Sequence, residues 1–528
     1  MASFGPHQSA HDLVPAALEK PSSLTPLSLL KHSWFRWLWL CITAPILLYW
    51  QFQLALQPQQ LDHTYSNRAG VGVHREEAFV YFLYHLNLYP LATTLQEPED
   101  SATEARRLIE QEADTLRTEV NHTARYGEHL KSHLLLLDAL QKQSTRHPSY
   151  TFANGWAFRI ALLALLISFC WAGYPFLATV LVVVLGSNPF QLHEIYAREN
   201  VHGWVITTAI VLLALMVPVL KANRGRIYPW FAALLSALWL GSVVHIRSEP
   251  VVMLLAVAAA FLLMEKVSIL QRLALVVVLF LGYGTVSTAW HDYFTWKIEQ
   301  STQVVQKAGG VPYQGPREFT HQFWHPLHVG LADFDQKYGF KWDDRWAARK
   351  LFPRLREQGV EIPPWDGTTY RFMDAWHDDG KRYYKALLLI PGFYELSKES
   401  YFAAIANDPW WYTKILLKRG WALLTDLTPL SLEAGSWRWQ IPISGLWLGP
   451  VLWIMWREKN QFFFKLLLFT LPTCLPAFVM YAGRGMTFMA IYHLIAFMVL
   501  LTWLLGRLWE VFPTLAGHKK ADPPAEPV

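Results

Sequence analysis

The apolar residues of this 528-residue chain come in long blocks, and two long polar segments separate them. A helix needs about 20 apolar residues to cross a bilayer, and several blocks approach that length. The composition agrees, because 53% of the residues are hydrophobic and only 16% are charged, whereas soluble domains carry about 25% charged residues. The sequence therefore predicts an all-α polytopic membrane protein with about 10 transmembrane helices and a mixed helix and loop extracytoplasmic insert.

The apolar blocks give the predicted spans directly. They cover 34–56, 156–186, 203–220, 227–244, 251–264, 269–289, 439–456, 461–481 and 486–506. Segment 156–186 is interrupted at Gly173-Tyr174-Pro175, so it forms either a hairpin of two short spans or one kinked helix. The hairpin is favoured, because short cytoplasmic loops collect Lys and Arg, and only the count of ten spans puts the basic loop 221–226 in the cytoplasm.

The apolar blocks and the distribution of Lys and Arg divide the chain into membrane and extramembrane parts, with about six spans in the central bundle. The parts are a cytoplasmic tail (1–33), the first span (34–56), extracytoplasmic amphipathic helices (57–155), the central bundle (156–289), an extracytoplasmic insert (290–438), the last three spans (439–506) and a cytoplasmic tail (507–528). We expect an integral protein of a bacterial inner membrane with both termini in the cytoplasm. The net charge is only +5, without a Lys/Arg tract, so nucleic acid is not an expected partner.

A pair of carboxylates follows the first span, at Glu76 and Glu77, and opens an aromatic, apolar stretch. Such a stretch predicts a helix on the membrane surface, where one carboxylate could deprotonate an incoming nucleophile. The alternative is that both residues only complement the dipole of a helix N-terminus.

Two short outer loops carry further polar residues. His193 and Glu194 lie in one loop, where they could act as an acid/base pair or as part of a divalent metal site, or could simply be solvated. Arg247 lies between two spans with almost no loop, and the planar fork of its guanidinium suits a phosphate. The alternative role of Arg247 is to pair with Glu249 and anchor a tight turn.

The insert contains a stretch rich in His, Asp and aromatic residues. Its candidate substrate-binding residues are Trp324, His325, His328, Asp343 and Asp344. The spacing of His321, His325 and His328 matches no common zinc signature, and Pro326 is expected to prevent a regular helix. Aromatic rings with carboxylates suit a sugar better, although a structured loop packed by Trp and His is an equal alternative. No metal or cofactor is predicted, and a divalent ion stays possible.

The arrangement of spans and these motifs together resemble the GT-C class of polytopic glycosyltransferases, which use polyprenyl-phosphate-linked sugars. The stretch Glu76-Glu77-Ala-Phe-Val-Tyr-Phe-Leu is similar to the Asp-Glu-x-x-Tyr-Leu pattern of that class, with Glu in place of the usual Asp. The resemblance implies that Glu76, Glu77 and Glu194 are catalytic and that Arg247 contacts the phosphate of the donor.

The resemblance also implies an activity: transfer of a sugar from a polyprenyl-linked donor to an extracytoplasmic glycan, lipid or protein, by a single displacement with a carboxylate base. The expected partners are the donor, the acceptor and the lipid bilayer. Two alternatives stay open. An O-antigen ligase or polymerase would use His325, His328 and Arg247 instead of the carboxylates, and a transporter or membrane assembly subunit would be no enzyme at all.

Overall fold

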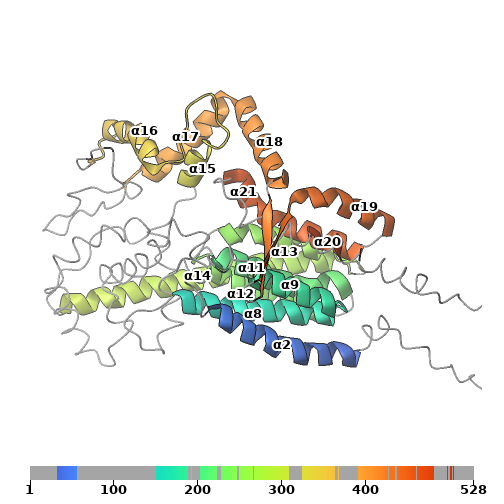
Figure 1. Ribbon diagram of the computed structural model, residues 1–528. Helices are drawn as coiled ribbons and strands as arrows, with labels where there is room; N and C mark the ends of the chain where they lie inside the picture. Colours follow the sequence, from blue (N-terminus) through green and yellow to red (C-terminus); the bar gives the residue numbers. More distant parts are fainter. Residues whose placement is uncertain are drawn as a thin grey trace, which may run out of the picture.

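The structure is a computed structural model, and most of the residues it describes are helical (Figure 1). The described residues are 33–55, 150–187, 192, 195, 203–222, 227–246, 249–265, 267–307, 324–362, 365, 367, 390–425, 427–434, 437–458, 461–480, 496, 497, 500, 501 and 504.

The first apolar segment and the broken one pack together as α2 (Ser33–Ala55), α8 (Tyr150–Trp171) and α9 (Pro175–Ser187). Near the start of α2, Arg36 Nη1 donates to the carbonyl oxygen of Trp171, at 2.9 Å. Near its end, Gln51 Nε2 donates to the carbonyl oxygen of Gly186, at 2.7 Å. Helix α2 therefore runs antiparallel to α8 and parallel to α9, so α8 and α9 form a hairpin. The chain reverses at Gly173, whose φ of 90° favours glycine.

Four more helices of the bundle precede the insert (Figure 1). They are α11 (Gly203–Ala222), α12 (Tyr228–Val243), α13 (Met253–Leu262), which follows the short helix η4 (Glu249–Val252), and α14 (Ile269–Lys307). Helix α11 packs on α8, and α12 packs on α14. The second pair is close because Gly241 has no side chain: a Cβ there would lie 2.8 Å from the Cβ of Val286. Small residues at a crossing let two helix backbones approach.

One apolar core fills this bundle, with Phe158 and Phe169 of α8, Ile210 of α11 and Phe261 of α13 among its buried residues. Three described helices contain a segment long and apolar enough to cross a membrane, namely Asn154–Trp171, Gly203–Lys221 and Ile269–Tyr293. Shorter apolar helical segments are Pro175–Ser187, Tyr228–Val243, Glu249–Leu262 and Gln461–Thr470. The bundle is thus compatible with a membrane protein, and the count of ten spans stays a prediction.

The structure differs from the expected all-α fold at the predicted span 439–456. Residues Trp437–Ile443 form strand β2, which pairs antiparallel with β1 (Thr428–Ala434). The residue pattern accounts for the strand, because the large residues Trp437, Trp439 and Ile441 alternate with polar residues and a proline, which is the period of a strand.

After β2, the structure has shorter helices where the sequence predicts long membrane spans. Helix α19 (Leu448–Glu458) follows the short helix η6 (Gly445–Trp447). The predicted span 461–481 consists of α20 (Gln461–Thr470), η7 (Leu471–Cys474) and α21 (Leu475–Met480). Pro472 lies at the change from α20 to η7 and removes one helical hydrogen bond. Most of the predicted span 486–506 lies outside the described residues.

Helix α14 continues beyond the predicted span 269–289 to Lys307, so the helix extends into the predicted insert. Four further helices of the insert form a group beside the bundle (Figure 1). They are α15 (Trp324–Gly330), α16 (Asp344–Glu357), α17 (Phe393–Asn407) and α18 (Pro409–Thr425). Helix α15 packs on α17 and α21, and α18 also contacts α21. The short helix α21 therefore joins the insert to the bundle.

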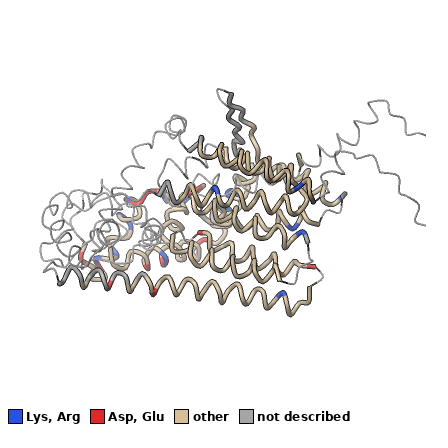
Figure 2. The backbone as a smooth tube through the Cα atoms, turned by 90° about the horizontal axis from the view of Figure 1, so that it is seen from below, with Lys and Arg blue, Asp and Glu red and all other residues tan. Residues whose placement is uncertain are grey.

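Charged residues of the bundle gather toward the ends of its helices, and the helices between are largely free of them (Figure 2). At one end, Lys221 Nζ donates to the hydroxyl of Tyr174, at 2.8 Å. The ring of Phe462 stacks on Tyr174 with centroids 5.4 Å apart, and Lys465 pairs with Glu265. Lys221 of the predicted cytoplasmic loop 221–226 thus meets residues of the α8–α9 turn and of α20 at one end of the bundle.

Candidate functional site

Helix α15 carries three of the candidate substrate-binding residues, and it forms in spite of Pro326. The expectation that this proline prevents a helix is wrong because Pro326 is the third residue of α15. In the first turn of a helix the missing N–H has no intrahelical partner in any case. The helix buries His325, Leu327 and His328 against its neighbours.

His325 is held by a residue of another helix. Its Nε2 lies 2.8 Å from Oδ1 of Asp344, the first residue of α16. Its ring packs 5.4 Å from that of Phe393, at the start of α17. The other ring nitrogen, Nδ1, is buried and has no hydrogen-bond partner among the residues that the structure describes. His325 thus links three helices of the insert.

His328 lies one turn further along α15 in an aromatic environment. Its ring centroid is 5.8 Å from that of Phe340, edge to face, and 5.7 Å from that of Trp346. Burial lowers the pKa of His328 to about 4, and the neighbouring His325 contributes to the decrease. At neutral pH His328 is therefore an uncharged part of the insert core.

Asp343 has a different role from its neighbour. It is the N-cap of α16, and its Oδ1 accepts a hydrogen bond from the backbone N–H of Arg345, at 3.0 Å. Arg345 Nε also lies 3.1 Å from the same oxygen. The capping interaction satisfies a backbone donor that the first turn of a helix leaves free. Asp343 is therefore accounted for by helix capping.

Trp324, at the start of α15, lies among aromatic rings of α17. Its ring centroid is 5.2 Å from that of Phe402 and 6.2 Å from that of Tyr401. Lys398 Nζ lies 5.5 Å from the Trp324 ring centroid, within the range of a cation–π contact. Trp324 is only partly buried.

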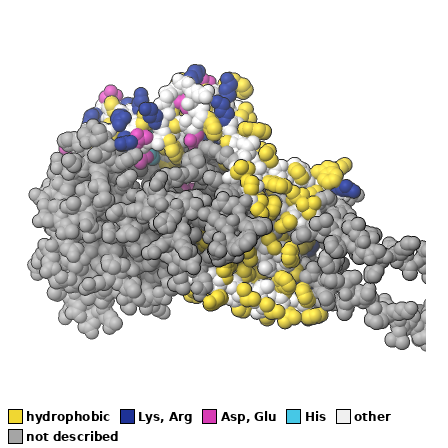
Figure 3. All heavy atoms as spheres, in the orientation of Figure 1, with side chains coloured by type: hydrophobic (Ala, Val, Ile, Leu, Met, Phe, Trp, Pro, Cys, Tyr) yellow, Lys and Arg dark blue, Asp and Glu magenta, His cyan; other side chains and the backbone are white. Residues whose placement is uncertain are grey.

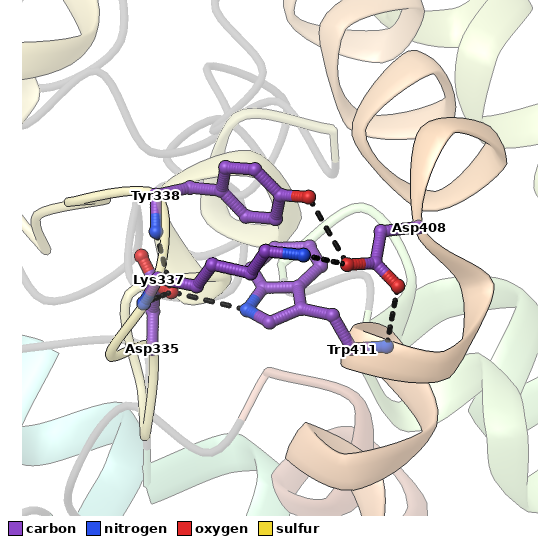
Figure 4. A network of polar contacts seen from close by, with 5 residues as sticks. All are labelled: Asp335, Lys337, Tyr338, Asp408 and Trp411. Carbon is purple, nitrogen blue, oxygen red and sulfur yellow. Dashed lines mark hydrogen bonds and ion pairs between the residues drawn. The ribbon is translucent and has the colours of Figure 1, made fainter.

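A polar network holds the loop after α15 against the junction of α17 and α18 (Figure 4). Asp335 accepts hydrogen bonds from the backbone N–H groups of Lys337, Tyr338 and Phe340, and from Trp411 Nε1 at 3.0 Å. Lys337 Nζ lies 2.5 Å from Oδ2 of Asp408, and the hydroxyl of Tyr338 donates to the same oxygen at 3.0 Å.

Both carboxylates of this network are stabilised in the ionised form. The hydrogen bond from Lys337, with that from the Trp411 backbone, lowers the pKa of Asp408 to about 2. Burial opposes ionisation of Asp335, but its four hydrogen bonds hold its pKa below the usual range. The network therefore stays charged at all physiological pH values and fixes the loop.

Arg419 of α18 is a buried charge that joins the insert to the bundle. Its guanidinium donates to the carbonyl oxygen of Gly330, at the end of α15, and to that of Val479 in α21. Burial lowers its pKa, while Asp333 favours its charged form. A cation at a helix C-terminus is also favoured by the helix dipole.

One segment of the bundle and one helix of the insert approach the same element, α21. Helix η4 begins at Glu249, two residues after Arg247, and contacts α21. Helix α15 contacts α21 as well. Nearby, His245 Nε2 lies 2.9 Å from the carbonyl oxygen of Ser287 in α14. Segments far apart in the sequence thus meet around α21.

The structure places only part of the predicted site. Trp324, His325, His328, Asp343 and Asp344 come together around α15 and the start of α16. The remaining candidates lie outside the described residues; they are Glu76, Glu77, His193, Glu194 and Arg247. Within the described residues, no group of three or more His, Cys, Asp or Glu side chains is arranged to hold a metal ion.

Two buried arginines were not among the sequence candidates. Arg419 is one, and Arg159 of α8 is the other, with its Cζ 4.1 Å from the ring centroid of Phe52. Both could be found from sequence, since each interrupts an apolar pattern. Arg159 lies within an apolar run, and Arg419 continues the buried series Trp411 and Ile415 at intervals of four residues.

No family model, curated protein or solved structure matches this chain.

Proposed function

We propose that the protein is a membrane glycosyltransferase that moves a sugar from a polyprenyl-phosphate-linked donor to an extracytoplasmic acceptor. The observation that supports this most is the meeting of η4, just after Arg247, and α15 of the insert at α21. A phosphate-binding arginine close in sequence to η4, with an aromatic, acidic insert that reaches the same helix α21, would suit a lipid-linked sugar.

In this proposal the phosphate of the donor binds Arg247, and Arg159 adds positive charge within the outer part of the bundle. A buried arginine in an apolar helix is costly and is kept where it serves a ligand or partner. The acceptor hydroxyl gives its proton to Glu76 or Glu77 and attacks the anomeric carbon. The bond from that carbon to the phosphate oxygen breaks, and polyprenyl phosphate leaves with the electron pair.

The orientation in the proposal follows the basic end of the bundle. Arg36, Lys221 and Lys465 gather there with the Gly173 turn. Under the rule that cytoplasmic loops carry the excess of Lys and Arg, this end faces the cytoplasm. We infer an inner-membrane protein of a bacterium with cytoplasmic termini and its insert outside.

The ligase-like alternative depends on His325, His328 and Arg247, and the structure describes the two histidines. Both side chains are buried, and His325 Nε2 already contacts Asp344. A general base must reach the proton it removes, so these contacts support a structural role for the two histidines and favour the carboxylates as catalysts. Glu194 stays the second candidate acid in the proposal.

The test uses the full-length protein in lipid nanodiscs with a panel of polyprenyl-phosphate sugars, and it measures release of polyprenyl phosphate. We expect turnover with at least one donor, and its loss in Arg247→Ala. Arg356→Ala, on the exposed face of α16, is the matched control and should keep full activity. Absence of donor consumption across the panel, with the protein folded, would contradict the proposal.

A further inference from the structure

Helix α18 exposes a row of large apolar side chains along one face. Trp410, Leu417 and Trp421 expose 63%, 64% and 65% of their surface. Their spacing of seven and four residues puts them on one side of a helix, since a helix has about 3.6 residues per turn. Tryptophans lie near both ends of this row.

The opposite face of α18 is buried in two different cores. Trp411 and Ile415 belong to the core of the insert, with Leu327 and Leu331. Leu423, near the other end of α18, belongs to the core of the bundle. Between them, Gly420 lets α18 approach α21, because a Cβ at Gly420 would lie 3.3 Å from Cε2 of Phe478. The C-terminal half of α18 is therefore fixed to the apolar bundle itself.

This attachment makes the exposed row continuous with the apolar outer surface of the bundle. Figure 3 shows hydrophobic side chains running from the region of α18 down over the bundle helices. Helix α19 adds Trp453 and Trp456, both exposed. In Figure 1, α18 is steeply inclined to α8 and α14. If the bundle helices cross a membrane, α18 lies closer to the membrane plane than to its normal.

The charges beside the row suit the polar boundary of a bilayer. Lys414 and Lys418 are exposed next to it, and Lys414 Nζ lies 5.6 Å from the ring centroid of Trp410. Lysine can keep its charged end at the phosphate level while its methylene stem covers apolar surface. Tryptophan is enriched at the same depth.

We propose that α18 is a membrane-docking helix, with Trp410, Leu417 and Trp421 in the outer lipid leaflet and Lys414 and Lys418 at lipid phosphates. Such a helix binds through apolar area and through attraction to anionic lipids. The sequence predicts that the insert lies outside the membrane, and α18 is the part of the insert that would enter it. The proposal rests on the bundle lying in a membrane and is independent of the glycosyltransferase reaction.

The experiment measures the surroundings of nitroxide labels by electron paramagnetic resonance. The full chain carries Cys41→Ser, Cys170→Ala and Cys474→Ala, and it is reconstituted in vesicles of phosphatidylethanolamine and phosphatidylglycerol. Single cysteines then replace Leu417 and Trp421. Leu281→Cys, on the exposed face of α14, is the lipid reference, and Lys350→Cys, on the exposed face of α16, is the water reference. Accessibility to molecular oxygen reports lipid, and accessibility to a water-soluble nickel chelate reports water.

We expect the ratio of oxygen to nickel accessibility at positions 417 and 421 to match that at 281 and to exceed that at 350 several-fold. A ratio equal to that at 350 would overturn the proposal. Low accessibility to both reagents would overturn it as well, since it means that another protein segment or a second copy covers the face. A water-like value at 281 would remove the membrane basis itself, and with it the orientation used for the proposed function.

The lysines are tested separately. The double variant Lys414→Gln/Lys418→Gln should lower the ratio at 417 in vesicles with phosphatidylglycerol, and it should have little effect in vesicles of phosphatidylcholine alone. An equal effect in both kinds of vesicle would contradict a contact with anionic lipid phosphates.

Discussion

The Nε2 of His325 and the Oδ1 of Asp344 lie 2.8 Å apart, although the two residues are on different helices. Asp343, the neighbour of Asp344, caps its own helix and contacts Arg345 of the same helix. We therefore expect substitutions of the two carboxylates to differ in their effect on the stability of the insert.

Asp344→Asn removes the charge from the contact with His325, so we expect it to destabilise the insert by about 1 kcal/mol. Asp343→Asn should have almost no effect, because Asn and Asp are about equally good N-caps. Hydrogen exchange of α15 is the measurement. If both variants leave exchange unchanged but weaken acceptor binding, the carboxylates serve the ligand and not the fold.

The buried side chain of His328 should make the stability of the insert depend on pH. Its folded-state pKa of about 4 is below the ordinary value of 6.5, so the unfolded state binds the proton more tightly. Keeping His328 neutral therefore adds up to about 3 kcal/mol to the free energy of unfolding above pH 6.5, and this stabilisation is lost as the pH falls toward 4. His328→Phe should flatten this slope in thermal unfolding, whereas His291→Gln, at an exposed position, should keep it. A slope unchanged in His328→Phe would contradict the assignment.

Arg419→Lys keeps the positive charge but loses the planar fork that reaches two carbonyl oxygens. One buried carbonyl is then left without its donor, at a cost of about 1–3 kcal/mol. We expect hydrogen exchange to rise in both α15 and α21 and to stay constant in α16. Arg356→Lys, on the surface, is the control. Faster exchange in α15 alone would show that Arg419 does not hold the insert on α21.

Gly241→Leu should separate α12 from α14, since even a Cβ at this position would lie 2.8 Å from Val286. Overpacking of this kind costs about 1–3 kcal/mol. Gly284→Ala on α14 is the matched control, because its Cβ would meet no atom within 4 Å. The midpoint of thermal aggregation in detergent should fall for the first variant and stay level or rise for the second. Equal midpoints would mean that the two helices are not packed as described.

Glu76→Gln and Glu77→Gln test the catalytic proposal. Adjacent residues on a helix point about 100° apart, so only one of them can face the reacting sugar. Loss of a general base lowers the rate about 10²–10⁴-fold, and the other variant should be nearly silent. The rate of polyprenyl phosphate release is the readout. Two silent variants, together with an inactive His325→Ala, would favour the ligase-like alternative.

The sequence predicts the helical bundle better than it predicts the site. A long run of apolar residues is enough to predict a helix such as α11. The break at Gly173 predicts where α8 ends and α9 begins. The contact between His325 and Asp344 could not be predicted, because it joins side chains from two helices whose packing no local pattern specifies. Strand β2 was missed because hydropathy alone does not separate a short apolar strand from a helix.

In the proposed membrane orientation, the basic end of the bundle has a consequence for how the chain inserts. Arg36 caps α8, Lys221 contacts Tyr174, and Lys465 pairs with Glu265, so three segments from distant parts of the sequence share one end. To invert the protein, all three would have to change sides together. In that orientation the topology would be a redundant property of the assembled bundle, and neutralising any single one of these cations should leave the orientation unchanged.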